Sequence, residues 1–313
     1  MGKAIEYNAT LEERVDHTEA LTTFKIVPDQ PMDGDPKFVP GQYTTLGLNN
    51  EENEELGSVK RAMSIASAPE KDGALEFYIR FVAHPESPNP LTHLLWKLQD
   101  GQRIWMGERA KGKFTLEHTL EEDDSRTKVL VAAGTGLAPF VSMVRSEKLR
   151  DDSVDLGSYA ILHGASYPED LVYREELEAL AASNGMRYRR SISRPKEAPE
   201  WNGDVGRVED YFLADRLGDL ESELGLPPGG LTPDAAVVFI CGLTGTIGKT
   251  IERLLGRGFV PQDRKIRRAL EVPDELPSNV FYEQYDSTPV IDVNDPAVID
   301  PLREALHKAL AAD

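Results

Sequence analysis

Cysteine is nearly absent from this chain of 313 residues, in which Cys241 is the only one. A single thiol excludes a disulfide within the chain and a four-cysteine zinc or iron–sulfur site. Long apolar runs are also missing: none approaches the roughly 20 residues of a membrane span, and the first residues lack the apolar core of a signal peptide. These absences predict a cytoplasmic protein with no metal site and no membrane contact.

Positive charge is scarce as well. The 35 lysines and arginines face 54 aspartates and glutamates, which gives a formal net charge of −19. Nucleic acids and anionic membranes attract basic surfaces, so this balance argues against both as partners. A hydrophobic content of 40% in a chain of this length is enough for a buried core and predicts two domains.

The first part of the chain has the pattern of a small antiparallel barrel or sandwich. Residues 20–118 contain short strand-like runs separated by turn residues, and one helical piece, LTHLLWKL, interrupts them. We expect a first domain over 1–120 and an acidic linker over 121–128. The expected strands are LTTFKIV, GQYTTLGL, RAMSIAS, LEFYIRFV, QRIWMGE and GKFTL.

The second part alternates strands with helices, which predicts a doubly wound parallel sheet over 129–286. Ligands of such sheets lie outside the carboxyl ends of the strands. A C-terminal extension, 287–313, ends in the amphipathic segment PLREALHKALA. The expected strands are KVLVAAG, YAILHGAS, MRYRRSIS, AVVFICG and FYEQYD.

The stretch VVFICGLTGTIGKT, 237–250, has the ending of a phosphate-binding P-loop. The P-loop spacing, G-x4-G-K-[ST], requires a glycine at position 243, where Leu243 stands. We therefore interpret the stretch as the strand-to-helix turn of another nucleotide-binding fold.

A second glycine-rich turn, AAGTGLAPF at 132–140, also joins a strand to a helix. Gly134 and Gly136 let backbone amides approach an anion at the start of that helix. A tight turn that binds nothing would need the same glycines, but two such turns in one sheet favour a dinucleotide site between them.

These motifs together resemble the ferredoxin–NADP(+) reductase family, bacterial type. The resemblance rests on R-x-x-S at 61–64, GTGLAP at 134–139, CGL at 241–243 and the terminal E-x-Y at 283–285, in the family's order over about 20–286. It implies an antiparallel six-stranded FAD-binding barrel followed by an NADP-binding domain with a doubly wound parallel sheet. It further implies electron transfer between NADPH and ferredoxin or flavodoxin, with hydride passing between nicotinamide C4 and flavin N5. A related reductase of another acceptor, such as a ferric chelate or quinone, and a flavin-binding protein without catalysis are the alternatives.

The family's motifs also imply roles for residues of this chain. Arg61 would meet the FAD pyrophosphate and Ser64 flavin N5, while Cys241 would lie near nicotinamide C4, Glu283 on the proton path and Tyr285 on the flavin face. The residues implied for catalysis are Ser64, Cys241, Glu283 and Tyr285. Those implied for FAD are Arg61, Ala62, Met63, Ser64, Tyr78, Pro90, Leu91, Thr92, Thr135 and Tyr285. Those implied for NADP are Gly134, Thr135, Gly136, Ser166, Ser193, Arg194, Arg207, Gly242, Leu243 and Thr244.

Three features depart from the family's pattern. Met63 stands where the family has a flavin-stacking tyrosine, and Ser166 stands where bacterial members often have arginine. In addition, 28 residues follow Tyr285, where the family normally ends. We expect the first half of this tail to be kept extended by its prolines, and the leucine stripe of its second half to cover the flavin or to reach a second subunit. The alternative is a disordered terminus.

A basic cluster follows the stretch VVFICGLTGTIGKT in the sequence. Between positions 249 and 268, seven basic residues face two acidic ones, which gives +5 in a chain of −19. Such a surface could steer an acidic ferredoxin or flavodoxin, although a solvated helix face with its own salt pairs is the alternative. The basic residues are Lys249, Arg253, Arg257, Arg264, Lys265, Arg267 and Arg268.

Overall fold

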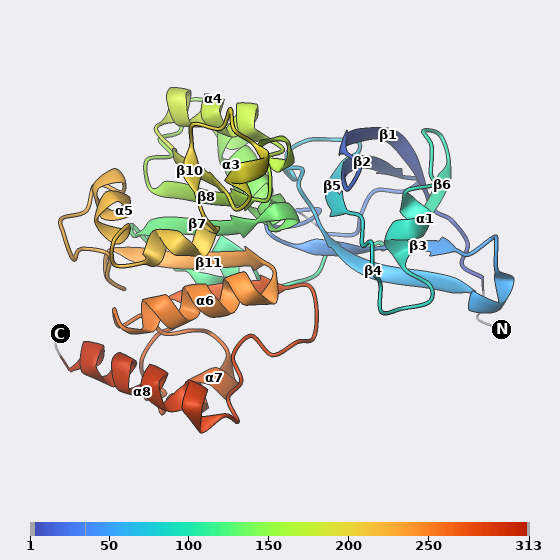
Figure 1. Cartoon of the computed structure of the whole chain (residues 1–313). Coiled ribbons are helices and arrows are strands. Elements are labelled where there is room, and N and C mark those ends of the chain that lie inside the picture. The colour runs from blue at the N-terminus through green and yellow to red at the C-terminus, as the bar shows by residue number, and fades with distance from the viewer. Residues whose placement is uncertain (1–3, 35, 312–313) are drawn as a thin grey trace. The chain divides into compact units, whose positions relative to one another are not determined.

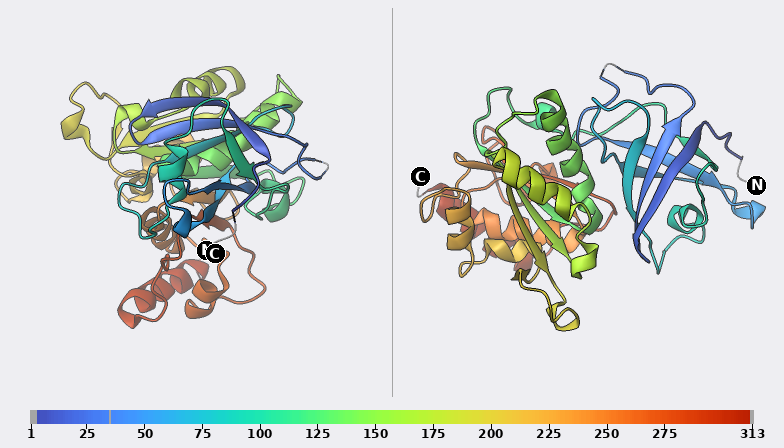
Figure 2. Two further views of the ribbon diagram at one scale, coloured as in Figure 1. Left: turned by 90° about the vertical axis from the view of Figure 1, so that its right-hand side faces the viewer. Right: turned by 90° about the horizontal axis from the view of Figure 1, so that it is seen from above.

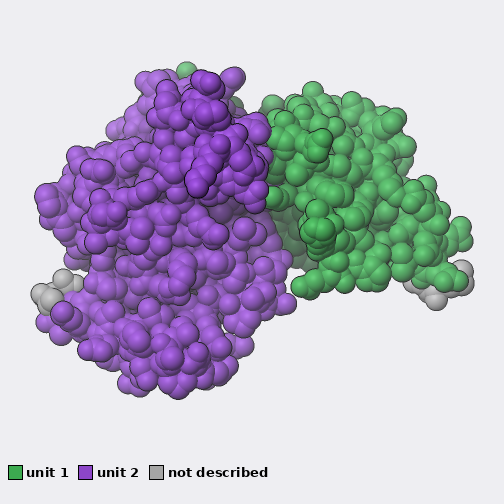
Figure 3. Space-filling model, in the orientation of Figure 1, with its two compact units in different colours: residues 1–121, 138–154 green, residues 122–137, 155–313 purple. Residues whose placement is uncertain are grey.

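The computed structural model describes residues 4–34 and 36–311, which form two compact units (Figure 3). Unit 1 contains the described residues up to Glu121 together with Ala138–Val154, and unit 2 contains Glu122–Leu137 and the described residues from Asp155 onward. The division differs from the expected boundaries because the chain enters unit 2 at Glu122, returns to unit 1 at Ala138 and enters unit 2 again at Asp155. Within the described ranges, no helix is long and apolar enough to cross a membrane.

Unit 1 is a six-stranded antiparallel sheet with the order β4-β3-β6-β1-β2-β5 (Figure 1). An isolated bridge between Ile65 and Phe77 joins the two end strands, so the sheet closes into a barrel around Phe24, Phe77 and Leu46, all fully buried. The predicted six-stranded antiparallel barrel is therefore confirmed. Its strands are β1 (Ala9–Thr18), β2 (Leu21–Pro28), β3 (Tyr43–Asn49), β4 (Ser58–Ser64), β5 (Leu75–Arg80) and β6 (Arg103–Met106).

One strand of the barrel differs from the sequence expectation. GKFTL at 112–116 was expected to be a strand, and this is wrong: Thr115 caps the short helix α2 (Leu116–Thr119) by accepting a hydrogen bond from the His118 amide. The sixth strand is instead β1, where Ala9 and Leu11 are buried but charged residues fill half of the remaining positions. A short helix, η1 (Glu54–Leu56), also lies in this part of the chain.

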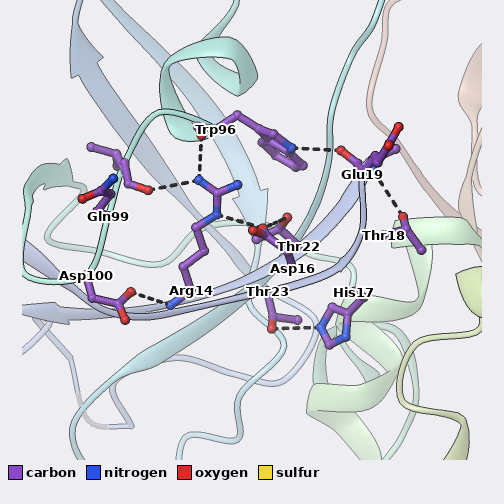
Figure 4. A network of polar contacts seen from close by, with 12 residues as sticks. Arg14, Asp16, His17, Thr18, Glu19, Thr22, Thr23, Trp96, Gln99 and Asp100 are labelled. Atoms are coloured by element: carbon purple, nitrogen blue, oxygen red, sulfur yellow. Dashed lines mark hydrogen bonds and ion pairs between the residues drawn. The ribbon is translucent and has the colours of Figure 1, made fainter.

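Helix α1 (Leu91–Leu95) is fixed to the barrel by Arg14 of β1 (Figure 4). The Arg14 guanidinium donates to the Trp96 carbonyl at 2.6 Å and the Leu98 carbonyl at 3.0 Å, so a cation satisfies acceptors just beyond the helix C-terminus. Asp16 accepts a further bond from the same guanidinium at 2.8 Å. These contacts hold the orientation of α1, whose N-terminus carries Leu91 and Thr92.

Helix α3 (Ala138–Arg150) belongs to unit 1 because its polar side chains reach the barrel. Ser142 donates to the Ser67 carbonyl at 2.7 Å, and Arg145 donates to the Glu76 carboxylate at 2.8 Å. Both contacts are at least partly shielded from water, which makes them stronger than surface pairs.

Unit 2 is a six-stranded parallel sheet with the order β10-β9-β8-β7-β11-β12, which confirms the predicted doubly wound fold. The chain runs outward from β7 through β8 and β9 and then returns to β11 beside β7, so the switch point lies between β7 and β11. The strands are β7 (Thr127–Ala133), β8 (Tyr159–Ala165), β9 (Arg187–Ile192), β10 (Asp204–Val205), β11 (Ala236–Gly242) and β12 (Val280–Gln284). The helices are η2 (Gly134–Leu137), η3 (Pro168–Asp170), α4 (Arg174–Asn184), η4 (Pro195–Glu197), η5 (Val208–Phe212), α5 (Leu217–Glu223), α6 (Thr244–Leu255), α7 (Arg264–Ala269) and α8 (Pro296–Leu310).

The C-terminal extension packs on unit 2 through α8, which lies along the outer side of α6 (Figures 1 and 2). Leu306 is fully buried in the unit 2 core, and Leu302 and Leu310 pack against the same cluster, so the leucine stripe covers this chain's own core. A disordered terminus is therefore wrong for the residues described, which run to position 311. The expectation of an extended, proline-rich half is also wrong, because Pro296 begins α8 and Pro301 lies inside it. Pro296 is tolerated because it stands in the first helical turn, where its missing amide has no partner to lose.

Candidate functional site

The two glycine-rich turns of unit 2 lie against each other at the switch point. A side chain at Gly136 would place its Cβ 2.0 Å from the Cys241 carbonyl oxygen, so only glycine allows this approach. Gly134 has φ +56° and open space where a side chain would stand. These features form a cradle of backbone in which neither glycine places a Cβ, as the close approach of a dinucleotide pyrophosphate requires.

Cys241, Thr135 and Tyr285 meet at the carboxyl ends of β7, β11 and β12. The Cys241 thiol donates to the Tyr285 hydroxyl at 3.2 Å, and that hydroxyl donates to the Thr135 carbonyl at 3.3 Å. Burial, and then the charge of Glu283, raise the pKa of the thiol well above its usual value, so Cys241 stays protonated. Glu283 lies beside Cys241 in the parallel register of β11 and β12. The structure thus gathers three of the four expected catalytic residues at one edge of unit 2.

Asp286, which the sequence analysis did not single out, also reaches this edge. The hydroxyl of Thr244, the first residue of α6, lies 2.9 Å from both carboxylate oxygens of Asp286 and donates its proton to this carboxylate. Burial opposes ionisation here, but hydrogen bonds from the Thr288 amide and the Thr244 hydroxyl outweigh it, so the pKa of Asp286 is lowered. Leu243, which precedes α6, offers no side-chain cap and is 68% exposed.

The residues expected at the 2′-phosphate of NADP follow the next strands of the sheet. The Arg194 amide donates to the Ser166 carbonyl at 3.1 Å and the Ser193 amide to the Ala165 carbonyl at 3.0 Å, which joins the ends of β8 and β9. The Arg194 guanidinium donates to the Tyr167 hydroxyl at 2.7 Å and lies over its ring. Tyr167 was missed in the sequence, where nothing but its place after a strand end marks it.

Arg207 follows β10 and has different neighbours. Its guanidinium is 3.9 Å from the buried carboxylate of Glu209, and its backbone amide donates to Asp210 at 2.8 Å. Its side chain is 72% exposed, so it is available to an incoming anion. Arg194 and Arg207 follow neighbouring strands but, within the described residues, share no hydrogen bond. Both remain candidates for binding the 2′-phosphate of NADP.

The residues expected at FAD in unit 1 lie on β4 and β5. The register between β3 and β4 is unbroken, so Arg61 and Ser64 face opposite sides of the strand: Arg61 is exposed and Ser64 is buried. Ala62 is exposed, whereas Met63 is half-buried against the barrel core. Tyr78 of β5 is almost fully buried.

The remaining expected FAD residues form the start of α1. Pro90 is its N-cap residue, and no side chain caps this end of the helix. The amides of Leu91 and Thr92 thus begin a helix whose first donors need partners from elsewhere. A phosphate is a suitable acceptor for such amides, so this segment of unit 1 fits the role that the family assigns to it.

In the structure, some residues of the basic cluster make internal contacts and others are exposed. Arg253 pairs with Asp210 at 3.0 Å, Arg257 pairs with the buried Glu221 at 2.6 Å, and Arg267 donates to the carbonyls of Pro273 and Leu276. These three arginines make contacts inside unit 2, so docking of an acidic partner near this cluster stays a prediction that depends mainly on the other four residues. The exposed members are Lys249, which pairs with Glu252, and Arg264, Lys265 and Arg268.

Comparisons with known proteins agree with this fold. Residues 130–250 match the family model described as an oxidoreductase NAD-binding domain. Ferredoxin–NADP reductase B of Sorangium cellulosum is 35% identical over 229 residues, which cover 73% of this chain and 82% of that protein. The electron transfer component XylA of the xylene/toluene monooxygenase of Pseudomonas putida is 27% identical over 218 residues, covering 66% of this chain and 54% of that protein.

Among solved structures, a ferredoxin NADP+ reductase from Neisseria gonorrhoeae with bound FAD and NADP has the same fold. It aligns with a TM-score of 0.69 at 23% identity, over 89% of this chain and 98% of that one. The fold, the paired glycine-rich turns and the similarity to the Sorangium enzyme lead to one conclusion. The chain belongs to the ferredoxin–NADP reductase family of oxidoreductases.

Proposed function

We propose that this protein binds FAD in unit 1 and NADP(H) in unit 2 and transfers electrons between NADPH and ferredoxin or flavodoxin. The observation that carries the proposal is the backbone cradle of Gly134 and Gly136 beside Cys241 and Tyr285. It places a backbone turn suited to a pyrophosphate next to a neutral thiol and an aromatic ring. That combination suits a nicotinamide dinucleotide better than a nucleoside triphosphate.

The FAD would supply the redox chemistry, accepting hydride from NADPH and passing electrons on singly. Arg61 and the amides of Leu91 and Thr92 would neutralise its pyrophosphate, as charge-assisted donors do. Ser64 and Glu283 would hold and move the proton at flavin N5. Met63, packed against the barrel core, would contact the ring through its polarizable sulfur without offering a hydroxyl.

In unit 2, the turns after β7 and β11 would hold NADP(H). Gly242, Leu243 and Thr244 form the second turn, next to Cys241. Tyr167 adds to the expected 2′-phosphate group, because it fixes the guanidinium of Arg194 by a hydrogen bond and by its ring. A fixed guanidinium loses less conformational entropy when it binds a phosphate.

The identity of the electron acceptor is tested by measuring the rate of NADPH-driven reduction of cytochrome c with and without added ferredoxin. We expect bound FAD in the visible spectrum, reduction of that FAD by NADPH, and a turnover that depends on ferredoxin. Ser64→Ala and Glu283→Gln should slow FAD reduction. Equal turnover with and without ferredoxin and flavodoxin, together with rapid reduction of a quinone or ferric chelate, would favour a different acceptor.

Arg194→Ala is expected to lower the preference for NADPH over NADH. A charge-assisted contact with the 2′-phosphate is absent from NADH, so its loss should reduce the ratio of kcat/KM values by about tenfold. Arg207→Ala should act in the same direction. Lys196→Ala, an exposed neighbour, is the matched control. If neither arginine variant changes the ratio, the phosphate is recognised elsewhere.

A further inference from the structure

A buried carboxylate lies next to one of the two arginines expected at the 2′-phosphate of NADP. Glu209 belongs to η5, which packs against α6 and against β7 and β8 of the sheet. Its side chain is only 3% exposed, and its Oε1 atom lies 3.9 Å from the Arg207 guanidinium. That distance is too long for a hydrogen bond, so the two groups interact through their charges alone.

The other oxygen of this carboxylate, Oε2, is shielded from solvent and has no hydrogen-bond partner among the described residues. A buried carboxylate without hydrogen bonds is costly, because it loses its hydration and gains little in return. The buried Glu221 of the same unit shows the usual solution, since it accepts from Arg257 at 2.6 Å and from two backbone amides. Hydrogen bonding of that kind does not account for the burial of Glu209.

Glu209 is held close to the edge of the sheet at which ligands of doubly wound folds bind. A Cβ at Gly164, near the carboxyl end of β8, would come within 2.7 Å of the Val208 side chain, so η5 starts directly against that strand. Arg207 stands immediately before η5 and has a side chain that is 72% exposed. A ligand can therefore reach the guanidinium, while the carboxylate beside it stays covered.

We propose that Glu209 is a specificity-determining residue, whose negative charge weakens the binding of a 2′-phosphate at Arg207 and so limits the preference for NADPH over NADH. This inference rests on the proposed function, because it assumes that Arg207 receives the phosphate. An anion that contacts the guanidinium also comes close to the Glu209 carboxylate, and like charges repel. Since the carboxylate is buried, water and salt screen this repulsion less than they screen surface charges. NADH carries a hydroxyl in place of the phosphate and escapes the repulsion.

The other expected arginine also has a carboxylate nearby. The Tyr167 hydroxyl, which accepts from Arg194 at 2.7 Å, donates to the Glu197 carboxylate at 2.8 Å. Glu197 is exposed, however, and the hydroxyl separates it from the guanidinium, so solvent screens its charge. Of the two carboxylates, the buried Glu209 is expected to have the larger effect on phosphate binding.

The inference is tested on the full-length protein by calorimetric titration with 2′,5′-ADP, a ligand that carries the 2′-phosphate without the nicotinamide. Glu209→Gln removes the charge and keeps the shape of the side chain, so it should lower the Kd about fivefold. In the FAD-loaded enzyme the same variant should raise the NADPH/NADH ratio of kcat/KM values by a similar factor. Glu209→Asp keeps the charge and should stay close to wild type in both measurements. Glu175→Gln removes an exposed charge on α4 and is the control for net charge.

A double-variant cycle shows whether the charge acts on a phosphate at Arg207. Arg207→Gln should weaken 2′,5′-ADP binding, and in that background Glu209→Gln should have a smaller effect, because the phosphate is no longer drawn towards the carboxylate. The inference is overturned, and the coenzyme site retained, if 2′,5′-ADP binds equally well to wild type and Glu209→Gln. It is also overturned if Glu209→Asp or Glu175→Gln acts as strongly as Glu209→Gln. If 2′,5′-ADP binds to no variant and not to wild type, the proposed coenzyme site is itself rejected, and the inference with it.

Discussion

Replacing Arg257 by alanine is expected to cost about 3–5 kcal/mol of unfolding free energy, because it leaves a buried carboxylate without its counter-ion. The Arg257 guanidinium lies 2.6 Å from the Glu221 carboxylate, whose side chain is 4% exposed, and also donates to the Leu231 carbonyl at 2.8 Å. Glu221 accepts two more bonds from the amides of Gly229 and Leu231. Those bonds keep the carboxylate in place after the arginine is gone, so it cannot move out to water.

Urea denaturation measures this effect, and Arg268→Ala is the matched control from the same basic cluster. Arg268 is exposed, so its loss should change stability by less than about 0.5 kcal/mol. If Arg257→Ala is as stable as wild type but reduces ferredoxin more slowly, Arg257 would contribute to docking rather than to stability.

The basic cluster shows where prediction from sequence reaches its limit. A run of arginines reveals charge but not the partner of each guanidinium, and the partners here come from distant segments: Asp210 for Arg253 and Glu221 for Arg257. The barrel strand β1 was missed for a related reason. Its pattern carries charge at positions that face solvent or the Arg14 network, so the alternation of apolar residues is too weak to detect.

Other parts of the fold were predictable because local physics decides them. The strands β7, β8 and β11 are continuous apolar runs, as strands buried on both faces must be, and glycines mark the turns that follow β7 and β11. The alternation of strands and helices also predicted that these two turns belong to one parallel sheet. The contacts of Tyr167 and Asp286 could not be predicted in this way, because each depends on a side chain that meets a partner from another loop.

Gly248→Ala is expected to destabilise the protein, although helix propensity alone predicts the opposite. Gly248 lies inside α6, where alanine is favoured over glycine by about 1 kcal/mol. The added methyl group would, however, come within 2.4 Å of the Val290 carbonyl oxygen, and a backbone atom cannot yield as a flexible side chain can. Such overpacking typically costs about 1–3 kcal/mol, and here it acts against Val290 and the buried Ile291 that follows.

The control for this variant is Gly245→Ala in the first turn of the same helix, where a Cβ would have nothing within 4 Å. Denaturation should show Gly245→Ala at or above wild-type stability and Gly248→Ala below it by about 1–2 kcal/mol, the difference between clash and propensity. A Gly248→Ala variant more stable than wild type would mean that Val290 does not cross α6 at this point. If the expected order is found, the glycine before Lys249 is there for the close passage of the C-terminal extension. That would explain how a chain without P-loop spacing comes to contain the sequence GKT.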